Sequence, residues 1–327
     1  MPQLRALLVG IDQYPDPRNN LNSCVNDTLA FRNMLMVSYG FDPADITMLH
    51  NRDATLDRVR TALDALCSGV TAGDRIVFFD SSHGYRFPRG NDLVEVICLY
   101  DQFLEDKELV DRSQTLPAGV LTAVCDCCHG GGLNKLFFPP GGTAAARTKV
   151  WQPPVDRVTD DLQLLQQVTR FKFFGRAPTR DTGTIVKQFS TVPEKNFAAA
   201  KGGEGGLDLN GLLFAACQAD ETAAAGSPPT NNLSAFTFAL LDQLAVDLPV
   251  ADLRDRATAR LRLLNMNQTP VTEAPALHPE QLTEALVTFA PATTGAPAQP
   301  SNGGPSTSPS PGFDPAVLAQ FLSGLTH

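Results

Sequence analysis

Residues 75–84 read RIVFFDSSHG and residues 120–132 read VLTAVCDCCHGGG. Each stretch begins as an apolar run, which predicts a strand buried on both faces, and then passes directly into polar residues and glycine. A third run of this kind, RALLVGI at residues 5–11, stands near the N-terminus. Amphipathic helical patterns separate the runs. We therefore predict an α/β fold, with a mostly parallel central sheet between two layers of helices.

Further elements follow from the hydrophobic periodicity outside these runs. Helices are expected over residues 22–39, 55–70, 160–169, 234–245 and 250–264, with Gly40 at a helix C-cap. Strands or extended segments are expected over residues 46–50, 94–100, 207–216 and 285–289. Residues 291–327 are rich in Pro, Ser and Gly and predict a tail with one short terminal helix.

The composition excludes several classes of protein. With 43% hydrophobic residues in 327, the chain can bury a sizeable core. The net charge of −9 argues against nucleic-acid binding, which depends on neutralising phosphates. No apolar stretch approaches the roughly 18 residues of a membrane span. The seven cysteines are an odd number without a disulfide framework, which favours reduced thiols in a cytoplasmic protein.

Two reactive side chains follow neighbouring strands. His83 comes after one buried run and Cys128 after the other, and the carboxyl ends of parallel strands meet at one edge of a sheet. A thiol needs a base to become a nucleophile, and a histidine on the neighbouring strand end supplies one. Backbone N–H groups at Gly84 and Cys128 are candidates for binding an oxyanion. This arrangement favours peptide hydrolysis or another acyl transfer.

Simpler interpretations exist for each residue taken alone. A Ser-His-Gly sequence is most often a loop, and a cysteine at a strand end is usually a small core residue. Cys125, Cys127, Cys128 and His129 resemble half of a zinc site, but the sequence contains no second Cys/His cluster to complete it. The matching positions of His83 and Cys128 at two strand ends favour the catalytic interpretation.

The motifs together resemble the metacaspases, caspase-like cysteine proteases. They are ALLVGI at 6–11, NSCVND at 22–27, FFDSSHG at 78–84 and VCDCCHGG at 124–131. AACQAD at 215–220, SAFTF at 234–238 and QTP at 268–270 resemble the small-subunit half. The resemblance covers roughly residues 4–290 and implies a caspase-like peptidase domain over 1–290. Its parts would be a large-subunit-like region (1–140), a connector (141–206) and a small-subunit-like region (207–290).

The resemblance also implies roles for single residues. His83 and Cys128 match the catalytic pair, and Cys127 becomes a packing neighbour. Asp27 and Asp126 match an acidic S1 pocket, with Cys24 and Ser81 as further wall residues. Two carboxylates would pair with a basic P1 side chain, so the expected substrates are proteins or peptides cleaved after Arg or Lys. We expect a monomer that needs no cofactor and binds neither nucleic acid nor membrane.

Some positions depart from the family pattern. Ser82 replaces a glycine before the histidine, and Gly130 replaces a serine after the cysteine. These changes leave open a catalytically weak or inactive scaffold that acts through protein binding. Asp92, Glu105 and Asp106 only partly match the calcium ligands of relatives, and Lys135 stands where an aspartate is usual. A cation there opposes a divalent ion, so we expect no calcium requirement.

The connector is rich in basic residues and reads as a loop. An enzyme that cleaves after Arg or Lys could therefore cut itself there, since exposed loops can enter a protease site. Solvated surface charge is the equally weighted alternative. The candidates are Arg147, Lys149, Arg157, Arg170, Lys172, Arg176, Arg180, Lys187, Lys195 and Lys201.

Overall fold

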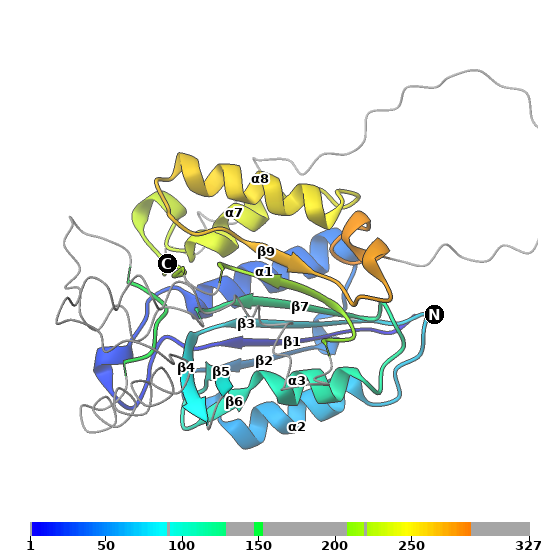
Figure 1. Ribbon diagram of the computed structural model, residues 1–327, viewed down its shortest axis with the longest axis horizontal. Coiled ribbons are helices and arrows are strands. Elements are labelled where there is room, and N and C mark those ends of the chain that lie inside the picture. The colour runs from blue at the N-terminus through cyan, green and yellow to red at the C-terminus, as the bar shows by residue number, and fades with distance from the viewer. Residues whose placement is uncertain (1, 90–91, 129–146, 153–207, 219–220, 289–327) are drawn as a thin grey trace, which may run out of the picture.

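The fold is built on one six-stranded sheet (Figure 1). The computed structural model describes residues 2–89, 92–128, 147–152, 208–218 and 221–288. The strand order is β2-β1-β3-β7-β8-β9. Five strands run parallel: β1 (Leu4–Gly10), β2 (Ile46–His50), β3 (Arg75–Ser81), β7 (Leu121–Asp126) and β8 (Leu212–Ala215). Only β9 (Val271–Glu273) is antiparallel to its neighbour, so the prediction of a mostly parallel sheet is confirmed.

Helices cover both faces of the sheet (Figure 1). One face carries α1 (Cys24–Tyr39), α7 (Ala235–Gln243) and α8 (Val250–Leu263), and the other carries α2 (Leu56–Cys67) and α3 (Asp106–Ser113). Strand residues alternate between the two layers. The core cluster that includes α1 and α7 contains Leu8, Phe79 and Phe214. The cluster that includes α2 and α3 contains their neighbours in the same strands, Leu7, Phe78 and Leu213. This explains why these strands carry apolar residues at successive positions rather than at alternate ones.

A small antiparallel sheet stands beside the main one and leads away from the end of β3. It consists of β4 (His83–Arg89), β5 (Asp92–Cys98) and β6 (Phe103–Glu105). Single-turn 3₁₀ helices occupy Pro17–Asn19, Pro43–Asp45, Asn51–Asp53, Pro228–Thr230 and Pro279–Thr283. Because β4 begins at His83, the histidine has strand geometry rather than lying in a loop.

Two details of the sequence-based prediction are wrong. Residues 285–288, the described part of the segment predicted as the last strand, form no strand: Ala285 makes one isolated bridge to Pro249, and the described sheet ends on β9 instead. The three residues of β9 are too few to show a periodicity. Helix α3 was not expected, because its eight residues are mostly charged. The helix predicted at 160–169, most of the connector and the 291–327 tail lie outside the described residues.

The carboxyl ends of the central strands are held in register. Gly10 pairs with Ser81, and Ser81 pairs with Asp126. A side chain at Gly10 would collide with the Cys24 carbonyl oxygen, so the glycine lets α1 approach the strand end. Asp12 caps α1 by accepting hydrogen bonds from the backbone N–H of Cys24 (2.8 Å) and Val25 (3.1 Å). The first turn of α1 therefore lies beside the ends of β3 and β7.

The residues that the structure describes include no helix that is long and apolar enough to cross a membrane.

Candidate active site

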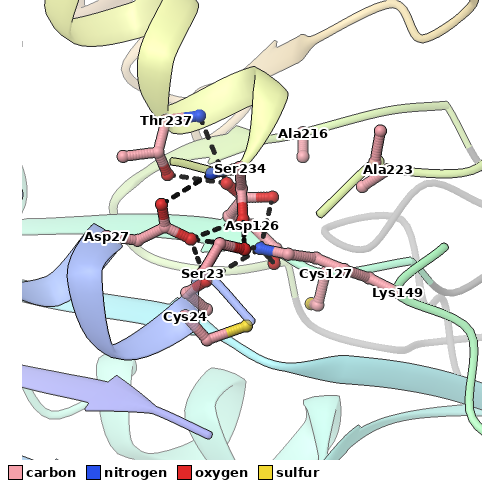
Figure 2. A network of polar contacts seen from close by, with 12 residues as sticks. Ser23, Cys24, Asp27, Asp126, Cys127, Lys149, Ala216, Ala223, Ser234 and Thr237 are labelled. Atoms are coloured by element: carbon pink, nitrogen blue, oxygen red, sulfur yellow. Dashed lines mark hydrogen bonds and ion pairs between the residues drawn. The ribbon is translucent and has the colours of Figure 1, made fainter. Parts of the chain in front are cut away.

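Two carboxylates lie fully buried at the carboxyl edge of the sheet (Figure 2). Asp27 comes from the first turn of α1 and accepts hydrogen bonds from Ser81 Oγ (2.7 Å), Ser234 N (2.8 Å) and Ser234 Oγ (2.5 Å). Asp126 ends β7 and accepts from Thr237 Oγ1 at 2.6 Å. Ser234 and Thr237 belong to the N-terminal end of α7, whose dipole favours negative charge. The acid pair is thus held by both halves of the chain.

A lysine from the connector lies between these carboxylates (Figure 2). The Lys149 side chain is completely buried, and its Nζ is 2.9 Å from Asp126 Oδ1 and 3.5 Å from Asp27 Oδ2. Nζ also donates to Ser81 Oγ and to the Asp126 carbonyl oxygen, both at 2.8 Å. Cys24 is close enough to interact electrostatically with it. The four residues proposed as pocket walls, Cys24, Asp27, Ser81 and Asp126, therefore all surround one lysine ammonium.

The charges in this cluster depend on one another. Burial alone would lower the pKa of the Lys149 ammonium, but the attraction of Asp126, Cys24 and Asp27 raises it above the ordinary value. Burial raises the pKa of Asp27 to about 6, against the opposing effect of Lys149. Lys149 therefore carries its charge at neutral pH. A buried ammonium of this kind is tolerated only because carboxylates surround it.

The main chain around Lys149 is extended and is bound on both sides. On one side Lys149 N donates to Ala223 O (3.0 Å), and Ala225 N donates to Arg147 O (2.7 Å). On the other side Gly84 N donates to Lys149 O (3.1 Å), and Trp151 N donates to Gly84 O (3.2 Å). The segment is therefore held by isolated β-bridges on both sides, Thr148 with Ala224 and Val150 with Gly84, and main-chain pairing of this kind is how many proteins hold an extended peptide.

His83 has a defined tautomer. Its Nε2 lies 2.7 Å from the Asn19 carbonyl oxygen, which can only accept, so Nε2 carries the hydrogen. Nδ1 is then the unprotonated nitrogen, and it is buried without a well-aligned hydrogen bond to any described residue. Burial lowers the pKa of His83 to about 4, although the Asn19 and Lys149 backbones oppose this shift. At neutral pH the ring is an uncharged base.

The Cys128 thiol has hydrogen-bond partners other than His83. Its Sγ accepts a hydrogen bond from Ala223 N at 2.6 Å and lies 3.8 Å from the Cys217 Sγ. No hydrogen bond joins His83 and Cys128, although both lie in the described part of the chain. The backbone of Gly84, the residue after His83, nonetheless packs against that of Cys128, because a Cβ at Gly84 would collide with the Cys128 carbonyl oxygen. Attack by Cys128 on a carbonyl at Gly84 therefore requires rotation of the thiol.

Cys127 occupies a different environment on the opposite side of the sheet. It belongs to the core cluster that includes α2 and α3, whereas Cys128 belongs to the cluster that includes α1 and α7. Burial, together with the negative charge of Asp80, raises the pKa of the Cys127 thiol well above its ordinary value. A thiol that resists ionisation is a poor nucleophile.

The residues considered for calcium are engaged elsewhere or only partly described. Glu105 makes a two-point ion pair with Arg89. Burial raises the pKa of Asp106 to about 7. Asp92 begins β5, and its side chain lies outside the description. The described residues contain no group of three or more His, Cys, Asp or Glu side chains able to hold a metal ion.

Several residues of this site were not predicted from the sequence. Lys149 stood among the basic connector residues, but nothing in the pattern marked it as the partner of the two aspartates. Asn19 contributes only its backbone carbonyl to His83, which no side-chain pattern reveals. Ser234 lies in one of the small-subunit motifs, which was the available signal for it. Its hydrogen bonds span 207 positions of sequence.

Comparisons with known proteins agree with the fold and the motifs. A family model described as the caspase domain, peptidase C14, matches residues 3–287. Metacaspase-9 of Arabidopsis thaliana is 27% identical over 261 residues, which cover 67% of this chain and 76% of that protein. Metacaspase-4 of the same plant is 34% identical over 145 residues, which cover 39% of this chain and 34% of that protein.

The crystal structure of protein GSU0716 from Geobacter sulfurreducens superposes with a TM-score of 0.59 at 20% identity and covers 89% of this chain and 100% of that one. This likeness concerns the fold alone. The family match, together with the sheet and its helices, defines the protein as a cysteine peptidase domain with a caspase-like α/β fold. The chain belongs to the caspase domain family, and the resemblance to metacaspases is confirmed.

Proposed function

We propose that the protein is a cysteine endopeptidase that cleaves proteins after Lys or Arg, with Cys128 as nucleophile and His83 as general base. The position of Lys149 carries this proposal. Its ammonium lies between Asp27 and Asp126, while its carbonyl oxygen accepts a hydrogen bond from Gly84 N. The Lys149 side chain therefore lies where a basic P1 side chain would bind, and its carbonyl lies where the scissile carbonyl of a substrate would bind.

The chemistry uses groups already near that carbonyl. Nδ1 of His83 takes the proton of the Cys128 thiol, and the sulfur bonds to the carbonyl carbon of the P1 residue. The oxyanion is held by the N–H groups of Gly84 and Cys128. The C–N bond then breaks as His83 returns the proton to the leaving amine. Water hydrolyses the thioester and restores the thiol. Asn19 keeps the ring in the required tautomer.

The acid pair accounts for the proposed specificity. Lysine and arginine both bring a positive charge between the two buried carboxylates, whereas an aspartate at P1 would add a third carboxylate without a partner. We expect Asp126→Ala to weaken cleavage of both basic substrates strongly. Preferential cleavage after Asp in a peptide library would contradict this pocket.

The first substrate in this proposal is the chain itself. Of the two basic connector residues that the structure describes, Arg147 and Lys149, it is Lys149 that lies against Gly84 with its side chain between the acids. We therefore assign self-processing to the Lys149–Val150 bond. The Cys128 thiol must first leave Ala223 N and turn toward the Lys149 carbonyl, so the described arrangement corresponds to a resting state before cleavage.

A non-catalytic scaffold is the second candidate. The observation in its favour is the Cys128 thiol, which is 1% exposed and hydrogen-bonded to Ala223 N rather than to His83. In that case Lys149 would be a permanent internal ion pair, and Ser82 would mark the loss of the usual glycine.

A fluorogenic peptide with Lys at P1 separates the two functions. We expect the unaltered protein to release the fluorophore, and we expect Cys128→Ala and His83→Ala each to lower kcat/KM by at least about a thousandfold. Cys127→Ala is the matched control and should keep most of the activity. N-terminal sequencing should find a new terminus at Val150 in active protein only. Absence of both activities would support the scaffold.

A further inference from the structure

The residues that follow Lys149 make contacts of their own, beyond those that the proposed reaction requires. The indole of Trp151, the only tryptophan in the chain, lies among three aromatic rings. The ring centroids are 5.3 Å away for Tyr14, 5.9 Å for Phe103 and 6.1 Å for His83, all in edge-to-face geometry. Edge-to-face packing of this kind adds to the free energy gained from burial.

The backbone on either side of Trp151 is anchored without regard to side-chain type. Gly84 forms a parallel bridge with Val150, and Trp151 N donates to Gly84 O. Beyond it, the Asn19 side chain pairs with Gln152: Nδ2 donates to Gln152 O (3.1 Å), and Oδ1 accepts from Gln152 N (2.8 Å). Asn19 is 1% exposed, so its buried amide is satisfied by the backbone of the bound segment.

The main-chain hydrogen bonds and the aromatic contacts have different roles, as in other sites where a peptide binds as an added strand. Main-chain hydrogen bonds hold any extended peptide, and a pocket for one side chain supplies the preference. The ring of Trp151 makes its aromatic contacts two positions beyond the proposed cleavage point at Lys149–Val150. Tyr14 is fixed there, because its hydroxyl accepts from His83 N (3.1 Å) and donates to Cys98 O (3.0 Å).

We propose that Tyr14, Phe103 and the edge of His83 form an S2′ subsite that selects an aromatic residue two positions after the cut. This proposal rests on the proposed function and narrows its substrate class. The preferred substrates then carry Lys or Arg, one further residue, and Trp, Phe or Tyr. The self-processing sequence Lys149-Val150-Trp151 fits that rule.

Internally quenched peptides with the sequence Arg-Thr-Lys-Val-X-Gln test the subsite on fully processed enzyme. We expect kcat/KM to be about tenfold higher with X as Trp or Phe than with X as Ala. Phe103→Ala should reduce this ratio to less than threefold. Leu263→Ala, on an exposed part of α8, is the control and should keep the full ratio.

Two failures are distinguishable. A coumarin amide of Lys has no residue at the second position after the cut, so it reports on the proteolytic activity alone. If that amide is not cleaved, the proposed function is wrong. If it is cleaved while the Trp, Phe and Ala peptides are processed within twofold of one another, the S2′ subsite is wrong and the protease assignment stands. An unchanged ratio in Phe103→Ala protein would also overturn the subsite.

Discussion

At the scale of single residues, the central feature is a charged amine with no access to water. Lys149 is completely buried, and its charge is balanced by Asp126 at 2.9 Å and Asp27 at 3.5 Å. Removing one partner of a buried ion pair leaves the remaining charge without solvation. The resting state therefore depends on this lysine, and cleavage after it would free the acid pair for other basic side chains.

Replacing Lys149 measures how far the stability of the folded protein depends on its buried charge. In the Cys128→Ala background, where the proposed mechanism allows no cleavage, we expect Lys149→Met to lower the free energy of unfolding by about 3–5 kcal/mol. The reason is that two carboxylates lose their buried cation. Urea unfolding followed by circular dichroism gives the value, and adding Asp126→Asn should recover part of the loss.

Lys107→Met is the matched control for that measurement. Lys107 also pairs with an aspartate, Asp111, but its side chain is 72% exposed, so no measurable change is expected. Equal stability of the Lys149→Met and Lys107→Met proteins would show that the lysine does not stay buried in solution.

At the scale of elements, the site exists because β4 begins immediately beside the end of β7. Gly84, the second residue of β4, packs on the backbone of Cys128 and presents its own N–H to the Lys149 carbonyl. A side chain there would collide with the Cys128 carbonyl oxygen. The absence of a Cβ, rather than an unusual backbone angle, is what this position requires.

Gly84→Ala should therefore separate the two strand ends. We expect kcat/KM on the Lys reporter to fall at least about a hundredfold, because the Gly84 N–H moves away from the developing oxyanion. Gly73→Ala is the control, since a Cβ there would meet nothing within 4 Å. It should change neither the kcat/KM nor the midpoint of unfolding. Near-normal activity of Gly84→Ala protein would remove Gly84 from the proposed mechanism.

At the scale of the whole molecule, the two halves of the chain form one sheet and one site. Strand β8 follows the connector yet pairs with β7 in parallel register, and α7 supplies the hydrogen bonds that hold Asp27 and Asp126. Their hydrophobic side chains share one core cluster, in which Phe214 and Phe236 from the second half pack with Phe31 and Phe79 from the first.

Cleavage at Lys149–Val150 should leave the halves together. We expect a single peak on native size-exclusion chromatography and two bands on a denaturing gel, because the β7–β8 ladder and the shared core do not depend on that bond. Urea should release the fragments. Separation of the fragments without denaturant would contradict the shared core.

The sequence by itself determined the buried strands, most of the helices, and the positions of His83 and Cys128 after two strands. These follow from periodicity, which is a local property of the chain. Only the tertiary structure decided that Lys149 lies between Asp27 and Asp126, that the Asn19 carbonyl sets the His83 tautomer, and that Trp151 lies among Tyr14, Phe103 and His83. Those contacts join residues 23 or more positions apart, and one of them uses a backbone atom common to every residue, so no local pattern records them.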